Sequence, residues 1–345
     1  MTPEHPEARP DFTPHATRDW VQMLAKYRDP SPLRSLVELG VTLAAFVVIW
    51  ALAVWALSFS WLAALALALL NGPFLVRLFA IQHDCGHAAY FRHRPANDWI
   101  GRALGVLTLT PYDVWRRSHS IHHSAAGNLD RRGIGDVQTL TVAEYFALTR
   151  RGRLLYRLYR NPAVLFGLGP CYIFFVNNRL PIGLMRAGWR YWLSAMATNL
   201  AIVAGLAGLY LLGGLAPIVL IWLPTSLVGA TIGVWLFYVQ HQFATTQWDS
   251  QAEWQIHDAA LLGSSHYILP QPLQWLTANI GVHHVHHLYS RIPFYRLPEV
   301  LRDFPALAAA QRMTIRQSLV NVKLHLWDEQ GRRLLSFAQA RALQA

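Results

Sequence analysis

The chain has 345 residues, of which 53% are hydrophobic and only 14% are charged. This composition is unusual for a water-soluble protein and favours an integral membrane protein. The formal net charge of +11 would suggest a nucleic-acid partner for a soluble protein, but here the basic residues gather beside apolar stretches. That pattern fits contact with anionic lipid headgroups, and we expect no nucleic-acid partner. The most basic of these segments contains the following residues: Arg150, Arg151, Arg153, Arg157 and Arg160.

The N-terminal part of the chain predicts a polar segment followed by a helical hairpin. Residues 1–35 lack the basic-then-apolar order of a secretory leader, so we expect this segment to stay in the cytoplasm. The apolar stretches 36–57 and 61–81 are each long enough to cross a hydrocarbon core of ~30 Å, which takes about 20 helical residues. The three residues between them suit a tight turn that returns the chain to its starting side.

A second hairpin is predicted further along, from the apolar stretches 192–212 and 216–240. The segment 162–176 is also apolar, but it is short and interrupted by glycine and proline, which indicates a re-entrant or interfacial segment. Four spans leave both termini on one side, and the arginine-rich loops mark that side as cytoplasmic, at the inner (plasma) membrane. We therefore predict a membrane domain over residues 36–300 and a cytoplasmic C-terminal segment over residues 301–345.

Three groups of closely spaced histidines stand out among the 16 in the chain. Residues 83–87 read His-Asp-Cys-Gly-His, residues 119–123 read His-Ser-Ile-His-His, and residues 283–287 read His-His-Val-His-His. Positions three or four apart share one face of a helix, so the imidazoles of each group are predicted to converge. His284 falls off that face and is the weakest candidate. The predicted metal ligands are the following: His83, His87, His119, His122, His123, His283, His286 and His287.

Eight imidazoles exceed the three or four protein ligands of a structural or hydrolytic zinc ion, so they predict two metal ions. The groups contain neither the glutamate of a zinc protease helix nor cysteine ligands, and two iron ions match this ligand type better. Iron held by neutral imidazoles would favour dioxygen as co-substrate and hydrogen abstraction from an unactivated methylene. His241, at the end of the fourth span, is a ninth candidate ligand.

The remaining histidines are interpreted as hydrogen-bonded or interfacial residues, because an isolated histidine near an apolar span is seldom a ligand. They are His5, His15, His93, His257, His266 and His325. Four aspartates near the groups have two interpretations: they accept hydrogen bonds from ligand imidazoles, or they form turns and caps. They are Asp84, Asp113, Asp136 and Asp258. Asn279 is either a water-mediated contact to a metal or a helix cap.

The same residues resemble the histidine motifs of the membrane fatty acid desaturases, and the sequence is similar to bacterial acyl-lipid desaturases of the Δ12 or omega-6 group. The resemblance extends through 128–136, 238–243, 261–265 and 288–297. It implies an all-α membrane protein with four transmembrane helices in two hairpins and a cytoplasmic helical cap. It also implies that the eight histidines, with His241 beside the fourth span, hold a di-iron centre. His266 departs from the aromatic residue expected there, which leaves a role in tuning the substrate channel open.

The predicted reaction is oxygen-dependent desaturation of acyl chains of membrane lipids, bound in a narrow apolar tunnel. Tryptophans predicted either to line this tunnel or to lie in an interfacial belt are Trp115, Trp235, Trp248 and Trp275. The chain has no dinucleotide fingerprint and no cysteine cluster, so an external donor must supply electrons. We expect an acidic ferredoxin or flavodoxin to dock on the basic segment 150–160. A hydroxylase or ketolase of a carotenoid, sterol or alkane is the alternative, and a metal transporter or histidine-rich sensor is the alternative outside oxidative chemistry.

Overall fold

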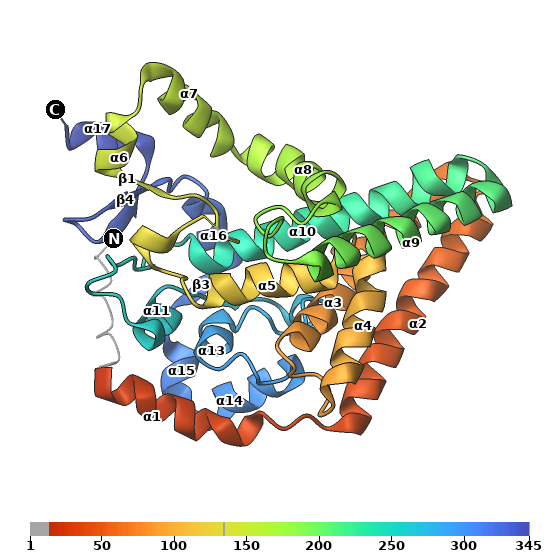
Figure 1. The fold of residues 1–345 in the computed structure, drawn as a ribbon, viewed down its shortest axis with the longest axis horizontal. Helices are drawn as coiled ribbons and strands as arrows, with labels where there is room; N and C mark the ends of the chain where they lie inside the picture. The colour runs from red at the N-terminus through yellow and green to blue at the C-terminus, as the bar shows by residue number, and fades with distance from the viewer. Residues whose placement is uncertain (1–13, 134, 345) are drawn as a thin grey trace.

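The fold is described from a computed structural model, and the description covers residues 14–133 and 135–344 (Figure 1). The backbone in these ranges is mostly helical. His5 lies outside the described residues, and so does the side chain of His15.

In the described part of the chain, four helices are long and apolar enough to cross a membrane, and they follow one another in two consecutive pairs (Figure 1). They are α2 (Pro32–Ala56), α3 (Trp61–Gly86), α9 (Trp189–Gly213) and the continuous helix Ile218–His241, which consists of the π-helical turn η5 (Ile218–Trp222) and α10 (Leu223–His241). Each predicted span overlaps one of these helices, so the predicted four-helix membrane protein is confirmed. The second helix extends past the predicted end of its span and carries His83 on its last turn.

The spans α3 and α10 approach each other closely because glycine lies at their contact. A Cβ atom added at Gly72 would lie 2.3 Å from Cγ1 of Val228, a distance that a real Cβ atom does not reach. A polar network also joins α2 and α3: Arg77 forms a buried ion pair with Glu38 and donates a hydrogen bond of 3.0 Å to Oγ1 of Thr42. The guanidinium of Arg77 stacks on Trp275 at 3.9 Å, which ties the spans to the cap, the part of the molecule outside them. A buried charge is tolerated when it is paired in this way.

The cap is built mainly from short helices (Figure 1). Its helices are α1 (Pro14–Leu24), η1 (Ala25–Tyr27), α4 (Arg94–Leu107), α5 (Tyr112–His123), η2 (Leu129–Arg131), α6 (Val142–Ala147), α7 (Arg150–Tyr159), η4 (Asn177–Arg179), α11 (Ile256–Leu262), α12 (Gln271–Leu276), α13 (His283–Leu288), η6 (Phe294–Arg296), α14 (Leu297–Asp303), α15 (Pro305–Ala309), α16 (Ile315–Asn321) and α17 (Phe337–Ala342).

Two small sheets join the C-terminal residues to the rest of the cap. The strands are β1 (Leu140–Thr141), β2 (His266–Ile268), β3 (Arg312–Thr314), β4 (Leu326–Asp328) and β5 (Arg333–Leu335). β2 pairs with β3 in parallel, and β4 lies between β1 and β5. The segment after residue 300 therefore packs onto the cap through backbone hydrogen bonds, a feature that its sequence did not predict.

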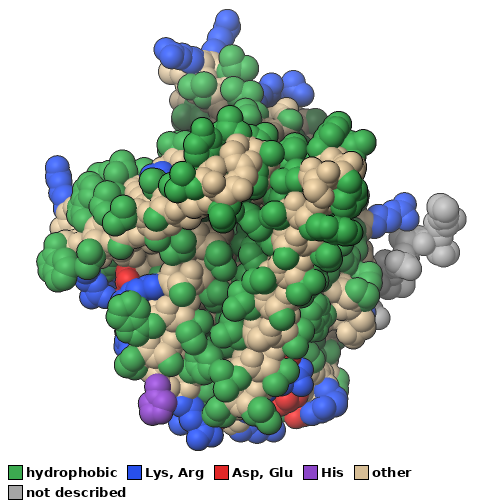
Figure 2. All heavy atoms as spheres, turned by 90° about the vertical axis from the view of Figure 1, so that its right-hand side faces the viewer, with side chains coloured by type: hydrophobic (Ala, Val, Ile, Leu, Met, Phe, Trp, Pro, Cys, Tyr) green, Lys and Arg blue, Asp and Glu red, His purple; other side chains and the backbone are tan. Residues whose placement is uncertain are grey.

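The predicted interfacial segment 162–176 is helical and lies beside α10. It consists of the π-helical turn η3 (Val164–Leu168) and α8 (Gly169–Phe175), and Oγ1 of Thr231 on α10 donates to the carbonyl oxygen of Phe166 at 3.3 Å. Figure 2 shows the face formed largely by the spans, where hydrophobic side chains dominate and most Lys and Arg side chains lie toward the outer edges of the view. Such a surface is suited to contact with a bilayer.

Candidate metal centre and apolar cavity

The three histidine motifs lie on three different helices that meet at the C-terminal ends of α3 and α10. His83 lies in the last turn of α3 and His87 caps its C-terminus, the second motif ends α5, and the third motif forms most of α13. His241 is the last residue of α10. All nine predicted ligands are brought together, whereas His93, His257, His266 and His325 lie outside the two groups they form.

The first group, which we term the five-histidine cluster, draws on all three motifs. Nε2 of His119 lies 3.0 Å from Nε2 of both His83 and His87 and 3.1 Å from Nε2 of His123. Nε2 of His286 lies 3.2 Å from Nε2 of His123. One ring nitrogen from each of these residues falls within a set whose members all lie within 4.8 Å of one another.

The second group, the four-histidine cluster, comprises His122, His241, His283 and His287. Nε2 of His241 lies 3.1 Å from Nε2 of both His122 and His283. Nε2 of His287 is buried and has no hydrogen-bond partner within the described ranges 14–133 and 135–344, which leaves an uncompensated donor or acceptor at this position. The prediction that the three imidazoles of one motif converge on one point was wrong, because His122 joins a different cluster from His119 and His123.

The spacing of the ring nitrogens fits the coordination shells of two metal ions. Imidazole nitrogens bind first-row metals at about 2.1 Å, so neighbouring ligands of an octahedral ion are about 3.0 Å apart. The closest nitrogen pairs in the two clusters lie 3.0 to 3.2 Å apart. A bound cation would also give the buried Nε2 of His287 a partner. The residues present therefore fit a two-metal site with an all-imidazole donor set.

The protonation of the imidazoles suits this role. Burial lowers the pKa of His119, His123, His286 and His287 well below the ordinary value of histidine, and the neighbouring imidazoles lower it further. These rings are therefore neutral at physiological pH. Metal ions bind the neutral form of imidazole.

Two of the four aspartates contact ligand rings. Oδ1 of Asp136 lies 2.5 Å from Nδ1 of His122, and Oδ1 of Asp84 lies 3.4 Å from Nδ1 of His83. Oδ2 of Asp84 also accepts a hydrogen bond of 2.7 Å from the backbone N–H of Phe294. Because Nδ1 is held on the far side of each ring, Nε2 is directed into the cluster.

The other two aspartates fit the second interpretation, in which they form turns and caps and do not hold a ligand imidazole. Asp113 accepts hydrogen bonds of 2.9 and 3.2 Å from Arg102, and Asp258 lies in the first turn of α11. Sequence reasoning missed one ligand anchor, the carbonyl oxygen of Gly263, which lies 3.0 Å from Nδ1 of His241. No side-chain pattern marks such an anchor, because it is a backbone group.

Asn279 is not the N-cap of the helix that carries the third motif, and a water-mediated contact to a metal stays a prediction. Its Nδ2 donates a hydrogen bond of 3.2 Å to the carbonyl oxygen of Phe294, and the N-cap of α13 is Val282. Asn279 instead has a positive φ of 54°, a backbone conformation that asparagine tolerates better than most residues. It thus contributes to the turn that precedes the third motif.

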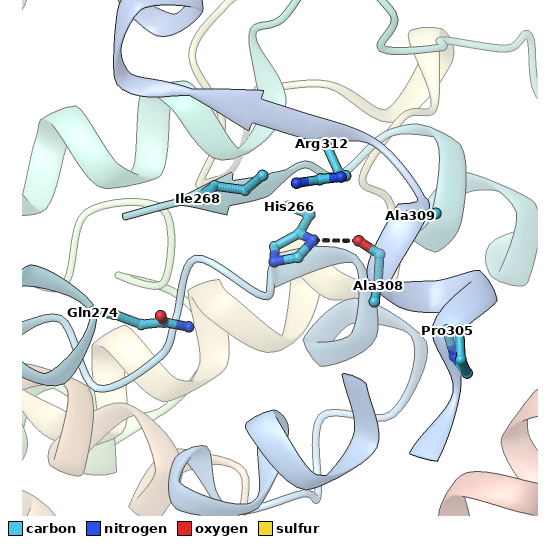
Figure 3. Close-up of a pocket in the computed structure, with 7 residues that line it drawn as sticks. All are labelled: His266, Ile268, Gln274, Pro305, Ala308, Ala309 and Arg312. Atoms are coloured by element: carbon cyan, nitrogen blue, oxygen red, sulfur yellow. Dashed lines mark hydrogen bonds between the residues drawn. The ribbon is translucent and has the colours of Figure 1, made fainter. Parts of the chain in front are cut away.

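His284 and His266 lie together, apart from both clusters. Nε2 of His284 is 2.8 Å from the carbonyl oxygen of Leu307, and Nδ1 of His266 is 3.1 Å from that of Ala308. His266 lines a separate cavity of about 390 Å³ with Arg312 and others, as Figure 3 shows. His266 is absent from the lining of the larger cavity described next, so the structure gives no support to its tuning of the substrate channel.

A larger cavity of about 710 Å³, which we term the apolar cavity, reaches both clusters. His83 and His119 of the five-histidine cluster line it, and so does His283 of the four-histidine cluster. Its other walls come mainly from α3, the segment 164–174 and α10, and they are mostly apolar. They include the following residues: Phe79, Val164, Leu168, Tyr172, Gly233 and Phe237.

Of the four tryptophans considered for the tunnel, only Trp115 lines the apolar cavity. Trp235 packs on Phe166 with ring centroids 5.0 Å apart, and Trp275 stacks on Arg77. Trp248 is buried in a different hydrophobic cluster of the cap. The remaining lining was not predicted, because its small and aliphatic residues carry no distinctive sequence signal.

The basic segment 150–160 is less available for docking than its sequence suggests. Arg160 is buried and donates hydrogen bonds to Oε1 of Gln242 and to the carbonyl oxygen of Leu324, at 3.0 and 2.9 Å. Arg157 donates to the hydroxyl of Tyr145 at 2.6 Å. The expectation that the whole segment forms a docking surface is therefore corrected: Arg160 holds the cap together.

The fold and the two clusters define a membrane protein with a buried, histidine-rich site that fits two metal ions and is joined to an apolar cavity. The sequence profile of the family described as fatty acid desaturase matches residues 59–318. The chain is 42% identical over 323 residues to a fatty acid desaturase of Bacillus subtilis (strain 168), which covers 94% of this chain and 91% of that protein.

Two proteins of Synechocystis sp. (strain ATCC 27184 / PCC 6803 / Kazusa) are also similar. One is an sn-1 oleoyl-lipid 12-desaturase, 26% identical over 66% of this chain and 64% of its own length. The other is an sn-1 acyl-lipid omega-3 desaturase (ferredoxin), 40% identical over 18% of this chain and 17% of its own length. The chain belongs to the fatty acid desaturase family. It is an oxidoreductase that introduces double bonds into fatty acyl chains, and the hydroxylase or ketolase alternative is not favoured.

Proposed function

We propose that the nine clustered histidines bind two iron ions and that the substrates are acyl chains of membrane lipids. The observation that carries this proposal is the meeting of two imidazole clusters at one apolar cavity. The all-imidazole donor set, without cysteine, supports iron over zinc held in a thiolate site. In this assignment His83, His87, His119, His123 and His286 hold one ion, and His122, His241, His283 and His287 hold the other.

Two iron ions, when bound, supply the binding and reduction of dioxygen and the removal of two hydrogen atoms from adjacent methylenes. The overall reaction takes one dioxygen, two external electrons and two protons, and it yields one double bond and two waters. The residues of the chain position the reactants. Phe79, Leu168 and Phe237 line a largely apolar cavity that suits an extended hydrocarbon and limits the access of water to the reacting carbons.

The names of the relatives support an acyl chain esterified in a lipid, since two of them are sn-1 acyl-lipid desaturases. The electrons come from a separate protein in this proposal. One relative is named as ferredoxin-dependent, and an acidic ferredoxin or flavodoxin would complement the net charge of +11.

The proposed location is the inner (plasma) membrane, with both termini and the histidine motifs on the cytoplasmic side. Four candidate spans, an even number, place both termini on the same side of the membrane, and the excess of arginine outside the spans supports the cytoplasmic side. A ferredoxin or flavodoxin would then reach the cap from the cytoplasm.

The proposal is tested by expressing the chain or its His286→Ala variant in a bacterial host and determining the double-bond positions of the membrane fatty acids by mass spectrometry. A new unsaturated lipid that appears only with the unchanged chain supports the proposal and assigns the position of the double bond. Purified protein supplied with iron, ferredoxin and a reductase should desaturate phospholipid in nanodiscs. Desaturation of acyl-coenzyme A, with no product from phospholipid, would refute the lipid substrate.

A further inference from the structure

Helix α7 exposes three leucines on the side turned away from the rest of the cap. Leu154, Leu155 and Leu158 are 67%, 55% and 55% exposed, and their spacing places them within about 100° of one another around the helix. Tyr156 lies on the opposite side, where it is buried and its hydroxyl donates a hydrogen bond of 2.8 Å to the carbonyl oxygen of His325. One side of α7 is therefore fixed to the rest of the cap, and the other presents an apolar strip.

Two arginines accompany this strip at the start of the helix. Arg150 and Arg151 are exposed, and neither forms an ion pair in the part of the chain that the structure describes. A basic helix with a continuous apolar strip is typical of a segment that lies in the interface of an anionic bilayer. This surface is less suited to an acidic redox protein, because three exposed leucines lie next to its basic residues.

The position of α7 along the chain joins this strip to the apolar cavity. The chain passes from α7 through η3 into α8, which lies beside α10 (Figure 1). Leu168 and Tyr172 of that segment are 66% and 57% exposed, and both also line the apolar cavity. The wall of the cavity is thus continuous with outward-facing apolar side chains. In Figure 2, Lys and Arg side chains and hydrophobic side chains lie together at the top of the molecule, where Figure 1 places α7.

We propose that α7 lies in the headgroup layer of the membrane, with its three leucines among the acyl chains and Arg150 and Arg151 on lipid phosphates. Together, α7 and α8 then form the entry through which the acyl chain of a phospholipid passes into the apolar cavity. This inference rests on the proposed lipid substrate, and it assigns Arg150 and Arg151 to the membrane surface instead of to an electron donor.

The first experiment measures where residue 155 lies. A Cys171→Ser background leaves only the buried Cys85, and a nitroxide is attached at Leu155→Cys or, as a control, at Leu343→Cys, an exposed position at the end of α17. Both proteins are placed in nanodiscs that contain phosphatidylglycerol. We expect the label at 155 to collide readily with oxygen and poorly with a water-soluble nickel complex, and the label at 343 to show the reverse.

Equal access of the nickel complex to both labels would overturn the proposal. So would a label at 155 that is shielded only after ferredoxin is added, because α7 would then be a protein-docking site. This measurement needs no turnover, and it therefore tests the position of α7 separately from the proposed reaction.

The second experiment tests the arginines. The paired variant Arg150→Gln, Arg151→Gln is compared with the control pair Arg333→Gln, Arg341→Gln, two exposed arginines in the C-terminal part of the cap. We expect the first pair to lose the stimulation of desaturation by phosphatidylglycerol, with a rise in apparent KM for lipid of about fivefold per arginine and an unchanged KM for ferredoxin. An increase in the KM for ferredoxin alone would contradict the proposal.

Discussion

The two histidine clusters share the second and third motifs, yet they are held in different ways, and the first motif contributes only to the five-histidine cluster. In the four-histidine cluster, His122 is fixed by Asp136 at 2.5 Å and His241 by the carbonyl oxygen of Gly263 at 3.0 Å. Among the residues that the structure describes, the only carboxylate contact in the five-histidine cluster is the longer one of His83 to Asp84, at 3.4 Å. Ligands whose rings are already oriented lose less freedom on binding a metal. The four-histidine cluster is therefore the more preorganised of the two.

The clusters also differ in their surroundings. His87, His119 and His123 of the five-histidine cluster are partly exposed, whereas His122, His241 and His283 of the four-histidine cluster are buried. The comparison indicates that the five-histidine cluster is more open to ligands and that the four-histidine cluster depends on its neighbours in the protein.

Removal of one ligand from each cluster should have the largest effect. We expect His286→Ala and His241→Ala each to reduce product formation by more than about 100-fold and to lower the bound iron from about two ions per chain to about one, because each cluster loses a donor that its ion needs. Fatty-acid analysis and elemental analysis of purified protein measure the two effects. His93→Ala, an exposed histidine outside both clusters, is the control. A His241→Ala protein with full iron and activity would exclude His241 as a ligand.

Removal of the anchors should have a smaller effect and should separate the clusters. Asp136→Asn weakens the contact that orients His122, and we expect a loss of about 10- to 100-fold in iron affinity. Asp84→Asn should lose less iron affinity, since the contact of Asp84 with His83 is longer. Iron titration of the variants measures this order, with Asp258→Asn as the control. A larger loss of iron affinity in Asp84→Asn than in Asp136→Asn would contradict the conclusion that the four-histidine cluster is the more preorganised.

A change in the wall of the apolar cavity should alter substrate choice while leaving both clusters intact. Gly233 lines the cavity, and a Cβ atom added there would meet no atom within 4 Å. Gly233→Leu therefore places a side chain in open cavity space, and we expect the longest accepted acyl chains to lose about tenfold in rate relative to shorter ones. Gly205→Leu on α9, whose added Cβ is also unobstructed, should leave the chain-length profile unchanged. Equal profiles for both variants would show that the acyl chain does not pass Gly233.

The smallest effect is expected within the third motif itself. His284 bonds the carbonyl oxygen of Leu307 and belongs to neither cluster. His284→Ala should lower the free energy of unfolding by about 1–3 kcal/mol, because a buried acceptor loses its partner, and it should keep wild-type iron content. Denaturation in detergent and elemental analysis test this. Loss of iron at unchanged stability would make His284 a ligand.

The sequence predicted much of the candidate site because its signals are local. The length of each apolar stretch predicts a span, and the three- and four-residue spacing of the histidines predicts helices. The distribution of the histidines was not predicted correctly. In the second and third motifs the two histidines four positions apart share a cluster, as His119 and His123 do, whereas the histidine three positions from one of them joins the other cluster. Positions four apart differ by about 40° around a helix, and positions three apart by about 60° in the opposite direction. Two ions on either side of the helix can therefore divide one motif.

By itself, the sequence determined the four helices, the helical motifs and the identity of the nine clustered histidines, because hydrophobic length and helical period act within a few residues. Tertiary structure alone decided which histidines meet, which groups orient them and where the cavity lies. Asp84, for example, accepts the backbone N–H of Phe294, which is 210 residues away, and Gly263 anchors His241 through a carbonyl group that every residue type carries. Contacts of this kind depend on how distant segments pack, and no local pattern encodes them.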